Sequence, residues 1–526
     1  MMFFIFFIFM VVCIKTSATV GLQGYDVVIE ADSNRALPTI DIIGLPDISI
    51  KESKERIKGA FRHCNLQIPR NKIILNLSPS DIKKSGTRYD LPMACAILHL
   101  GYEDSITNDL LTKAIILGEL GLDGSVKRID GLLPSVLSAI SRGHKIFVIP
   151  SGNQYEVSYI QGISIYPIDH FQTLVNHVFG TQMMKPSIQR DLSELKSVSV
   201  REYDFAAIKG HQLIKRALSI AVAGRHNVLL IGAPGCGKTM LSRAIQSILP
   251  PLPHESILEV SKIYSLVGKL DAQTPLIVHR PFRQVHHTAS KISIVGGGKN
   301  LTPGEVTLAH QGVLFFDELP EFPREVLEVL RQPIEDKEIC ISRVSGSVSY
   351  PANIMFVATM NPCKCGYYKD PVKACICSPR DIAKYQNTIS GPLLDRIDMI
   401  LEVPRENLDV LLSNGMADTQ SSDDLYTDVL TARNTQKTRY GQTTLTSNAD
   451  LQGGMINTYI HLDDASHAFL KQASTKLTLS PRVIHRIMKL ARTIADMDGD
   501  TQVSIKHLAE SLQYRSKSLF VEMEMM

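Results

Sequence analysis

The stretch His226-Asn-Val-Leu-Leu-Ile-Gly-Ala-Pro-Gly-Cys-Gly-Lys-Thr-Met-Leu-Ser-Arg243 decides the fold of this chain. It begins with an apolar run of strand length and ends with the apolar spacing typical of a helix. The turn between them reads Gly-x-x-x-x-Gly-Lys-Thr, which predicts a phosphate-binding loop between a buried strand and a helix. A glycine turn without a ligand is the alternative, and the strand and helix on either side argue against it.

Each part of this turn has a predicted role. The glycines allow backbone N–H groups to turn towards phosphate oxygens. Lys238 can reach the β- and γ-phosphates, and Thr239 can hold Mg²⁺. We expect Cys236 to be a small residue that faces away from the phosphates. The predicted cofactor-binding residues are Gly232, Ala233, Pro234, Gly235, Cys236, Gly237, Lys238 and Thr239.

A second apolar run, residues 313–316, ends in two adjacent carboxylates. ATP hydrolysis needs such a pair at the end of a buried strand, because Asp317 can hold Mg²⁺ and Glu318 can orient or deprotonate the attacking water. Acidic pairs at strand ends are common in isolation. Here the pair follows a phosphate-binding loop in the same domain, and this order favours the functional interpretation.

Two further polar residues complete the pattern. Asn361 follows a strand predicted over residues 354–359, where its amide can position the lytic water and contact the γ-phosphate. Arg396 would reach a neighbour's nucleotide as an arginine finger if the chain forms a ring. A local surface pair with Asp395 or Asp398 is the alternative. The order of loop, carboxylate pair, asparagine and arginine is that of an AAA+ ATPase core in an α/β fold.

Longer motifs surround this core. They are Arg280-Pro-Phe-Arg-Gln-Val-His-His-Thr-Ala-Ser290, Gly296-Gly-Gly298, Pro303-Gly-Glu-Val-Thr-Leu-Ala-His-Gln-Gly312, Asp317-Glu-Leu-Pro-Glu-Phe322 and Leu330-Arg-Gln-Pro-Ile-Glu-Asp336. Together they resemble the magnesium-chelatase-like ATPases of the YifB/ComM family, from about residue 17 to residue 515. One departure is Val285, where the family usually has proline, and it bears on the conformation of the surrounding insert.

The resemblance implies a hexameric AAA+ ring with ATP and Mg²⁺ as cofactors. For the best-known type of the family it also implies a DNA helicase that drives branch migration of recombination intermediates during natural transformation. The chelatase likeness leaves open an ATP-driven remodeller of protein complexes or a chelatase-like motor. The net charge of +3 excludes a general polyanion-coating role, so any nucleic-acid surface must be local.

Two segments that interrupt the predicted nucleotide fold are candidates for this surface. They span residues 276–302 and the hairpin 339–349, and such interruptions can project into the pore of a ring. Their cations could follow a phosphate backbone, whereas ordinary solvated residues or intersubunit pairs are the alternative. Base stacking is not indicated, because no aromatic residues other than Tyr350 accompany the hairpin. The basic residues are Arg280, Arg283, His286, His287, Lys291, Lys299, Lys337 and Arg343.

Four of the nine cysteines form two Cys-x-Cys pairs, Cys363 with Cys365 and Cys375 with Cys377. Four thiols can close a tetrahedral Zn²⁺ site and pin a loop next to Asn361. Reduced thiols or a redox-sensitive pair are the alternative, because Cys-x-Cys is less usual for zinc than Cys-x-x-Cys. The cysteines lack a secretory spacing, so we expect a reducing compartment and a cytoplasmic protein.

The N-terminal region, residues 14–180, alternates strand-like and helical runs and predicts an α+β domain. Residues 117–134 resemble the proteolytic domain of Lon-type proteases, which use a Ser–Lys dyad. Leu133 stands at the place of the lysine, and the serine's stretch offers only Ser85 in a lysine-rich turn. We therefore expect a degenerate scaffold, with a Lon-like protease as the less favoured alternative.

The remaining segments are assigned by composition. Residues 1–13 are an apolar N-terminal extension, or reflect a start codon placed too far upstream, and are too short to span a membrane. Residues 181–203 form a linker, residues 204–400 the α/β ATPase domain and residues 401–526 an all-α lid.

A helix of the lid begins with Ser480-Pro-Arg482, which supplies an N-cap serine and a proline at the first helical position. In related ATPases this position carries the second sensor, which touches the γ-phosphate. A pair between Arg482 and a nearby carboxylate is the alternative. The predicted catalytic residues are thus Glu318, Asn361, Arg396 and Arg482.

Overall fold

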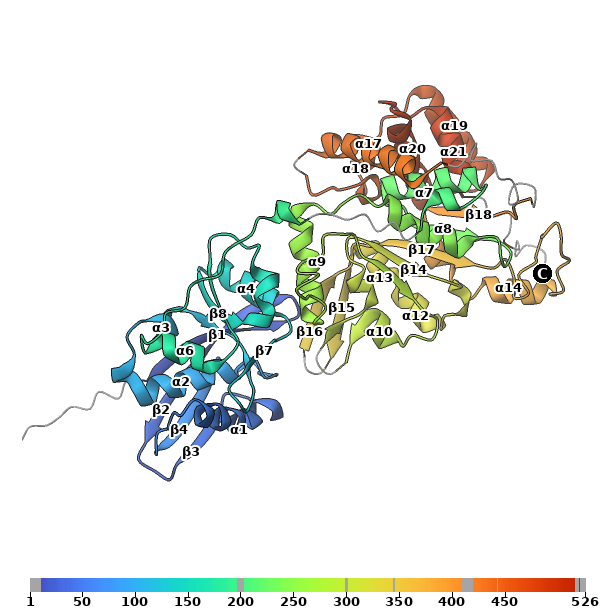
Figure 1. Ribbon diagram of the computed structural model, residues 1–526. Coiled ribbons are helices and arrows are strands. Elements are labelled where there is room, and N and C mark those ends of the chain that lie inside the picture. Colours follow the sequence, from blue (N-terminus) through green and yellow to red (C-terminus); the bar gives the residue numbers. More distant parts are fainter. Residues whose placement is uncertain are drawn as a thin grey trace, which may run out of the picture. The chain divides into compact units, whose positions relative to one another are not determined.

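Figure 1 shows the computed structural model, in which the chain divides into two compact units. The first unit comprises Met1–Lys196 with His254–Ile277, and the second comprises Ser197–Pro253 with Val278–Met526. Neither unit is one continuous stretch of sequence. The structure describes residues 11–195, 203–298, 301–343, 346–407, 420–441, 443–515 and 520. Most of the predicted N-terminal extension, part of the predicted linker, Lys299 and the side chain of Arg343 lie outside the described residues.

A seven-stranded mixed sheet forms the first unit, in the order β3-β4-β2-β1-β5-β8-β9. The strand β2 pairs antiparallel with both β1 and β4, and the other neighbours are parallel. Its strands are β1 (Val12–Val20), β2 (Gln23–Asn34), β3 (Thr39–Ile43), β4 (Lys72–Ser78), β5 (Ile115–Ile116), β8 (Ile146–Pro150) and β9 (Ser164–Ile168), with a separate hairpin of β6 (Glu119–Leu120) and β7 (Val126–Lys127). β1 thus begins inside the segment that the sequence assigned to the apolar extension.

Helices pack against this sheet because their apolar residues recur at helical spacing. Helix α1 (Ile48–His63), for example, buries Ile50, Ile57 and Phe61, and Asp47 caps its N-terminus by accepting from the N–H of Ile50. The other helices of the unit are α2 (Asp90–Tyr102), α3 (Leu110–Lys113), α4 (Leu132–Ser141), α5 (Gln154–Val157), α6 (Phe171–Val178) and α9 (His254–Leu266).

Helix α9 belongs to the first unit although its sequence lies inside the predicted ATPase domain. Ser265 is the centre of its contacts: its carbonyl accepts from the N–H of Gly131 at 2.8 Å, and its hydroxyl accepts from the N–H of Leu133 at 3.2 Å. The same hydroxyl donates to the buried carboxylate of Glu156 at 2.6 Å. Leu133 is fully buried at this contact, whereas Ser85 is exposed.

The second unit contains a five-stranded sheet in the order β11-β14-β17-β10-β18, and every pair in it is parallel. Its central strands are completely buried, which is why they read as continuous apolar runs in the sequence. The strands are β10 (Val228–Ile231), β11 (Phe282–Val285), β14 (Val313–Phe316), β17 (Met355–Met360) and β18 (Met399–Glu402). The predicted insert over residues 276–302 is therefore partly wrong, because β11 is an edge strand of the sheet.

Short helices and two small hairpins surround this sheet. The helices are α7 (Gln212–Gly224), α8 (Lys238–Ala244), α10 (Lys291–Val295), α11 (Glu305–Leu308), α12 (Arg324–Val329), α13 (Arg331–Asp336), α14 (Pro379–Gln386) and α15 (Gly391–Leu394). The hairpins are β12 (Gly296–Gly297) with β13 (Thr302–Pro303), and β15 (Glu338–Arg343) with β16 (Gly346–Pro351). The second of them matches the predicted hairpin at residues 339–349.

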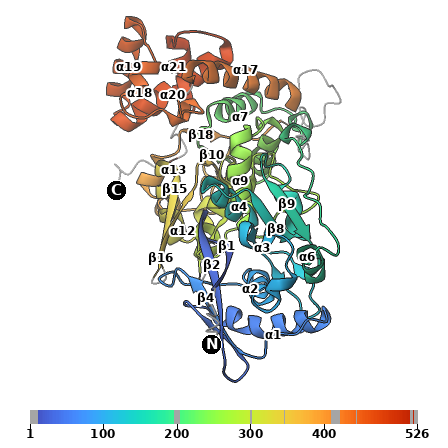
Figure 2. The same ribbon diagram turned by 90° about the vertical axis from the view of Figure 1, so that its left-hand side faces the viewer.

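The C-terminal part of the second unit is helical, and its helices α17 and α20 pack against α7 (Figure 2). These helices are α17 (Ser422–Tyr440), α18 (Met455–Tyr459), α19 (Asp464–Lys476), α20 (Pro481–Asp498) and α21 (Ile505–Gln513). The described residues include no helix whose length and apolar content would carry it across a membrane.

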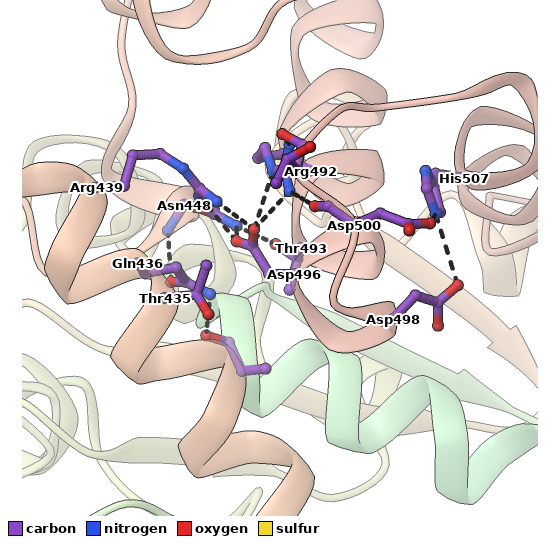
Figure 3. A network of polar contacts seen from close by, with 12 residues as sticks. Thr435, Gln436, Arg439, Asn448, Arg492, Thr493, Asp496, Asp498, Asp500 and His507 are labelled. Atoms are coloured by element: carbon purple, nitrogen blue, oxygen red, sulfur yellow. Dashed lines mark hydrogen bonds and ion pairs between the residues drawn. The ribbon is translucent and has the colours of Figure 1, made fainter.

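A buried carboxylate holds this helical part together (Figure 3). Asp496 of α20 is almost fully buried and forms ion pairs with Arg439 of α17 and with Arg492 of its own helix. It also accepts from the side-chain amide of Asn448 at 2.9 Å, and Asn448 in turn donates to Thr493. Because a buried charge must be paired, these contacts fix α17 against α20.

Replacement of Ser265 by alanine tests the contact of α9. The change removes a donor from the buried Glu156 carboxylate and an acceptor from the N–H of Leu133. We expect the free energy of unfolding to fall by about 1–3 kcal/mol, measured by urea unfolding. Ser256→Ala, at a partly exposed position of the same helix, should shift it by less than about 0.5 kcal/mol. Equal urea midpoints for the two variants would show that the Ser265 contact does not contribute to the free energy of unfolding.

Candidate nucleotide-binding site

The predicted phosphate-binding loop lies between β10 and α8. Gly235 and Gly237 adopt positive φ angles of 80° and 87°, which side-chain-bearing residues rarely adopt. A Cβ at Gly232 would lie 2.5 Å from the carbonyl oxygen of Val403 and 2.7 Å from Sγ of Cys236, so only glycine fits there. The Cys236 side chain is buried against this glycine.

The ammonium group of Lys238 is held by three oxygen atoms. Its Nζ donates to the carbonyl oxygens of Gly232 at 2.8 Å and Ala233 at 2.9 Å, and to Oδ1 of Asn361 at 3.1 Å. Burial lowers the pKa of Lys238, although Cys236 and nearby carboxylates oppose this shift. The structure therefore brings the lysine of the loop together with the predicted sensor asparagine.

The predicted Mg²⁺ ligands also meet. The Thr239 hydroxyl lies 3.3 Å and 3.2 Å from the two carboxylate oxygens of Asp317. A hydroxyl and a carboxylate are oxygen donors of the kind that Mg²⁺ prefers, so their chemistry fits this ion. Glu318 follows directly and adopts a left-handed backbone conformation with φ of 56°. Such a conformation is costly for a residue other than glycine and persists only where its neighbours enforce it.

Thr359, which was not among the residues predicted from the sequence, holds the backbone of Glu318 in this conformation. Its hydroxyl donates to Oδ1 of Asp317 at 2.5 Å and accepts from the N–H of Glu318 at 3.0 Å. Thr359 is fully buried and is the one hydroxyl residue in the otherwise apolar strand β17. A polar residue near the end of an otherwise apolar strand is the signal from which a role at the site could have been predicted.

Arg396 and Arg482 lie together but away from the loop. Both bind the carboxylate of Glu335, Arg396 through Nη2 and Arg482 through Nη2 at 2.7 Å. Burial lowers the pKa of Arg396, and the positive charges of Arg482 and Arg331 lower it further. In the described part of the chain Arg396 forms a local ion pair with Glu335 in place of the expected Asp395 or Asp398, and Arg482 forms the pair with a nearby carboxylate that was its alternative.

This arginine cluster is at the amino-terminal edge of the parallel sheet. Asn227, which precedes β10, donates from Nδ2 to the carbonyl oxygen of Arg396 at 3.1 Å. Asp398, which precedes β18, forms an ion pair with Arg486. A polar cavity of about 690 Å³ opens here and is lined by Glu335, Arg482 and Arg486 among others. The phosphate-binding loop lies at the opposite, carboxyl-terminal edge of the same strands.

The predicted DNA-binding cations divide into two groups. Arg280 donates to the carbonyl oxygens of Pro250 and Gln311, and Arg283 forms two hydrogen bonds with Glu305. Lys337 forms an ion pair with Asp450. These three side chains therefore bind within the second unit. His286 and Lys291 are exposed, and the ring of His287, which is partly buried, lies 4.2 Å from that of His286.

The four clustered cysteines come together after Asn361. One Sγ atom from each of Cys363, Cys365, Cys375 and Cys377 lies within 4.8 Å of all the others. Asp498, Asp500 and His507 of the helical part form a second acidic group, but its carboxylates already pair with Arg216, Lys506 and His507.

Comparisons with known proteins cover nearly the whole chain. Residues 29–153 match the family model described as subunit ChlI of Mg-chelatase, residues 204–411 match magnesium chelatase, subunit ChlI, and residues 419–515 match the C-terminal part of the same subunit. The protein YifB of Salmonella typhimurium is 37% identical over 505 residues, which cover 96% of each chain. The chain belongs to the YifB/ComM family of magnesium-chelatase-like AAA+ proteins.

Two further proteins are similar to this chain, and the first of them agrees with this placement. The competence protein ComM of Haemophilus influenzae is 36% identical over 508 residues, covering 96% of this chain and 97% of that protein. The DNA helicase MCM8 of Xenopus laevis is 23% identical over 286 residues, which are 50% of this chain and 30% of that protein. The family resemblance drawn from the sequence motifs is therefore confirmed. Membership of the family implies ATP and Mg²⁺ as ligands.

Replacement of Thr359 by valine tests the support of the two carboxylates. The change keeps the shape of the side chain but removes the hydroxyl that holds both Asp317 and the backbone of Glu318. We expect kcat for ATP hydrolysis to fall about 10- to 100-fold, measured in a steady-state phosphate-release assay. The control is Thr307→Val, because the buried Thr307 hydroxyl has no hydrogen-bond partner among the described residues. A Thr359→Val enzyme as active as this control would remove Thr359 from the site.

Proposed function

We propose that this protein is a Mg²⁺-dependent ATPase that works as a homo-oligomeric ring, a hexamer by family resemblance, and acts on DNA as a helicase or branch-migration motor. The observation that carries the proposal is the shared edge of strands β10, β14 and β17. At this edge Lys238 contacts Asn361, the next residue Thr239 contacts Asp317, and Thr359 joins Asp317 to the backbone of Glu318.

These residues divide the work of hydrolysis between them. Lys238 and the loop N–H groups would bind the β- and γ-phosphates, and Asn361 would contact the γ-phosphate. Thr239 and Asp317 would hold Mg²⁺, which neutralises charge on the phosphates when it is bound. Glu318 would orient the attacking water and accept its proton. Thr359 acts as a positioning residue, because it fixes the carboxylate of Asp317 and the backbone of Glu318 in one hydrogen-bonded unit.

The two arginines support a shared site between subunits. Arg396 and Arg482 lie at the opposite edge of the sheet from Lys238, so they would act on the nucleotide of a neighbouring subunit rather than on their own. The two arginines share one carboxylate, that of Glu335, so one positive charge is left over. This charge favours the binding of an anion such as a phosphate. In this proposal Arg396 is the arginine finger and Arg482 is a second sensor that acts across the interface.

Two features support DNA as the client. The names of the relatives include a competence protein and a DNA helicase. Exposed basic residues, among them Lys291, remain in the segment after β11. The magnesium-chelatase family models favour a second candidate, an ATP-driven remodeller of a protein complex or a chelatase-like motor. The buried Leu133 and the exposed Ser85 give a Lon-like protease no support.

The proposed domain organisation follows the sequence with one change. A degenerate Lon-like domain (14–180), a linker (181–203), an ATPase domain (204–400) and a helical lid (401–526) remain our assignment, with α9 assigned to the first unit. The proposed cofactors are ATP and Mg²⁺, with Zn²⁺ at the four clustered cysteines as a structural metal.

Mixing of inactive variants tests the site between subunits. Lys238→Ala and Arg396→Ala should each hydrolyse ATP at less than about a tenth of the parent rate. Equimolar mixing should restore hydrolysis above the sum of the two, because an intact loop then meets an intact arginine from its neighbour. The control mixture of Lys238→Ala with Glu318→Gln should show no such gain, since both changes fall in the same half of the site. Failure of the first mixture to gain activity would contradict action across the interface.

Measurement of the ATPase rate with and without nucleic acid tests whether DNA is the substrate on which the protein acts. With Glu318→Gln as the blank, the ATPase rate should rise several-fold with single-stranded, duplex or four-way-junction DNA and lose that rise at high salt. Lys291→Glu should weaken the stimulation, whereas Lys471→Glu on the exposed face of α19 should preserve it. A robust ATPase that is indifferent to every DNA would favour the protein remodeller.

A further inference from the structure

The loop that follows Asn361 gathers four thiols without a disulfide. Sγ of Cys363 lies 3.3 Å from Sγ of Cys365 and 3.6 Å from that of Cys375, and the last two are 3.5 Å apart. A disulfide requires about 2.05 Å. Sulfur atoms around a tetrahedral zinc ion, with Zn–S bonds of about 2.3 Å, are about 3.8 Å apart. The spacing of the cysteines therefore fits four ligands of one small cation.

Backbone N–H groups point at these sulfur atoms. Cys365 accepts from the N–H groups of Tyr367 and Ile376, and Cys363 accepts from those of Gly366 and Tyr368. Hydrogen bonds of this kind orient ligand atoms around a metal. Gly366, whose N–H is one of these donors, adopts a φ of 86°, a conformation that favours glycine.

Most of the loop that carries the four cysteines has no packed core of its own. Residues 361–378 contain neither a helix nor a strand, and most of their side chains are exposed or half-buried. A loop of this length without a core of its own requires another source of order. A structural metal would supply it, because the free energy of metal binding would contribute to fixing the fold of the loop.

The same loop forms a wall of the nucleotide site. A Cβ at Gly366 would lie 2.5 Å from Cδ of Pro234, so the loop backbone packs directly against the phosphate-binding loop. Asn361, which contacts Lys238, lies two residues before the first cysteine. Asp370 of the same loop forms an ion pair at 2.8 Å with Arg405, which lies three residues after the end of β18. The position of the loop therefore bears on both Pro234 and Asn361.

We propose that Cys363, Cys365, Cys375 and Cys377 bind one thiophilic divalent cation, Zn²⁺, and that its occupancy sets nucleotide affinity by holding the loop against Pro234 and Asn361. The second half of this inference rests on the proposed ATPase function. The first half does not, because metal content is measured without nucleotide. Zinc is favoured over Mg²⁺ or Ca²⁺, since these hard cations take oxygen ligands.

Metal content is the first test, made on the full-length protein purified without chelator. We expect about one zinc per chain by mass spectrometry of the metal, and the absorption bands of tetrahedral cobalt thiolate after replacement with Co²⁺. Cys365→Ser and Cys375→Ser should lose both signals, and Cys340→Ser, at an exposed cysteine elsewhere, should keep them. Metal-free parent protein that takes up no Co²⁺, or that forms disulfides among these cysteines instead, would overturn the site.

The second test separates the metal from its effect on nucleotide. Gly366→Ala should keep its zinc but bind a fluorescent ATP analogue about tenfold or more weakly, because the new methyl group meets Pro234. Gly162→Ala is the control, since Gly162 also adopts a positive φ, 78°, and a Cβ there meets no atom within 4 Å. Removal of zinc from the folded parent by a chelator should weaken binding to a similar extent. Unchanged affinity in both cases would overturn the coupling, whereas a parent that binds no nucleotide at all would overturn the proposed function and leave the metal result standing.

Discussion

The parallel register of β10, β17 and β14 is the constraint on which the candidate site depends. It places Ile231 beside Met360 and Phe316 beside Ala358, so the residues that follow each strand arrive at one edge of the sheet. A slip of one residue would turn Thr359 to the opposite face and take its hydroxyl away from Asp317. Complete burial of the three strands holds this register, because a slipped strand would have to repack closely packed side chains on both of its faces. The register that packs the core is thus the same register that brings the residues of the site together.

The two edges of this sheet have different chemistry. The carboxyl-terminal edge presents oxygen atoms and N–H groups around one lysine. The amino-terminal edge presents several arginines, and Glu335 and Asp398 are shared among them. In the proposed ring each subunit would offer the first edge to its own nucleotide and the second to its neighbour's. The buried pair of Asp496 with Arg439 of α17 keeps α20, which carries Arg482 and Arg486, in a fixed place relative to α17.

Local patterns were sufficient for much of this architecture. The phosphate-binding loop, the Asp317–Glu318 pair and most strands were predicted because each depends on residues only a few positions apart. Glu335 could not be found in this way, since it lies 61 residues from Arg396 and 147 from Arg482 in the sequence. Strand β11 was hidden for a different reason: it is four residues long, lies at the edge of the sheet and carries Arg283 and Gln284 in place of an apolar run. Thr359 likewise gained its role only from the strand beside it.

The divided first unit limits how this protein can be taken apart. Because residues 254–277 fold with the N-terminal sheet, the backbone passes from one unit to the other three times along the chain. No single cut therefore releases an intact N-terminal fragment, and a fragment that stops near residue 195 would lack the helix whose Ser265 covers Leu133. The same connection restricts exchange of domains between relatives, since a swapped N-terminal region must remain compatible with a helix encoded after the phosphate-binding loop.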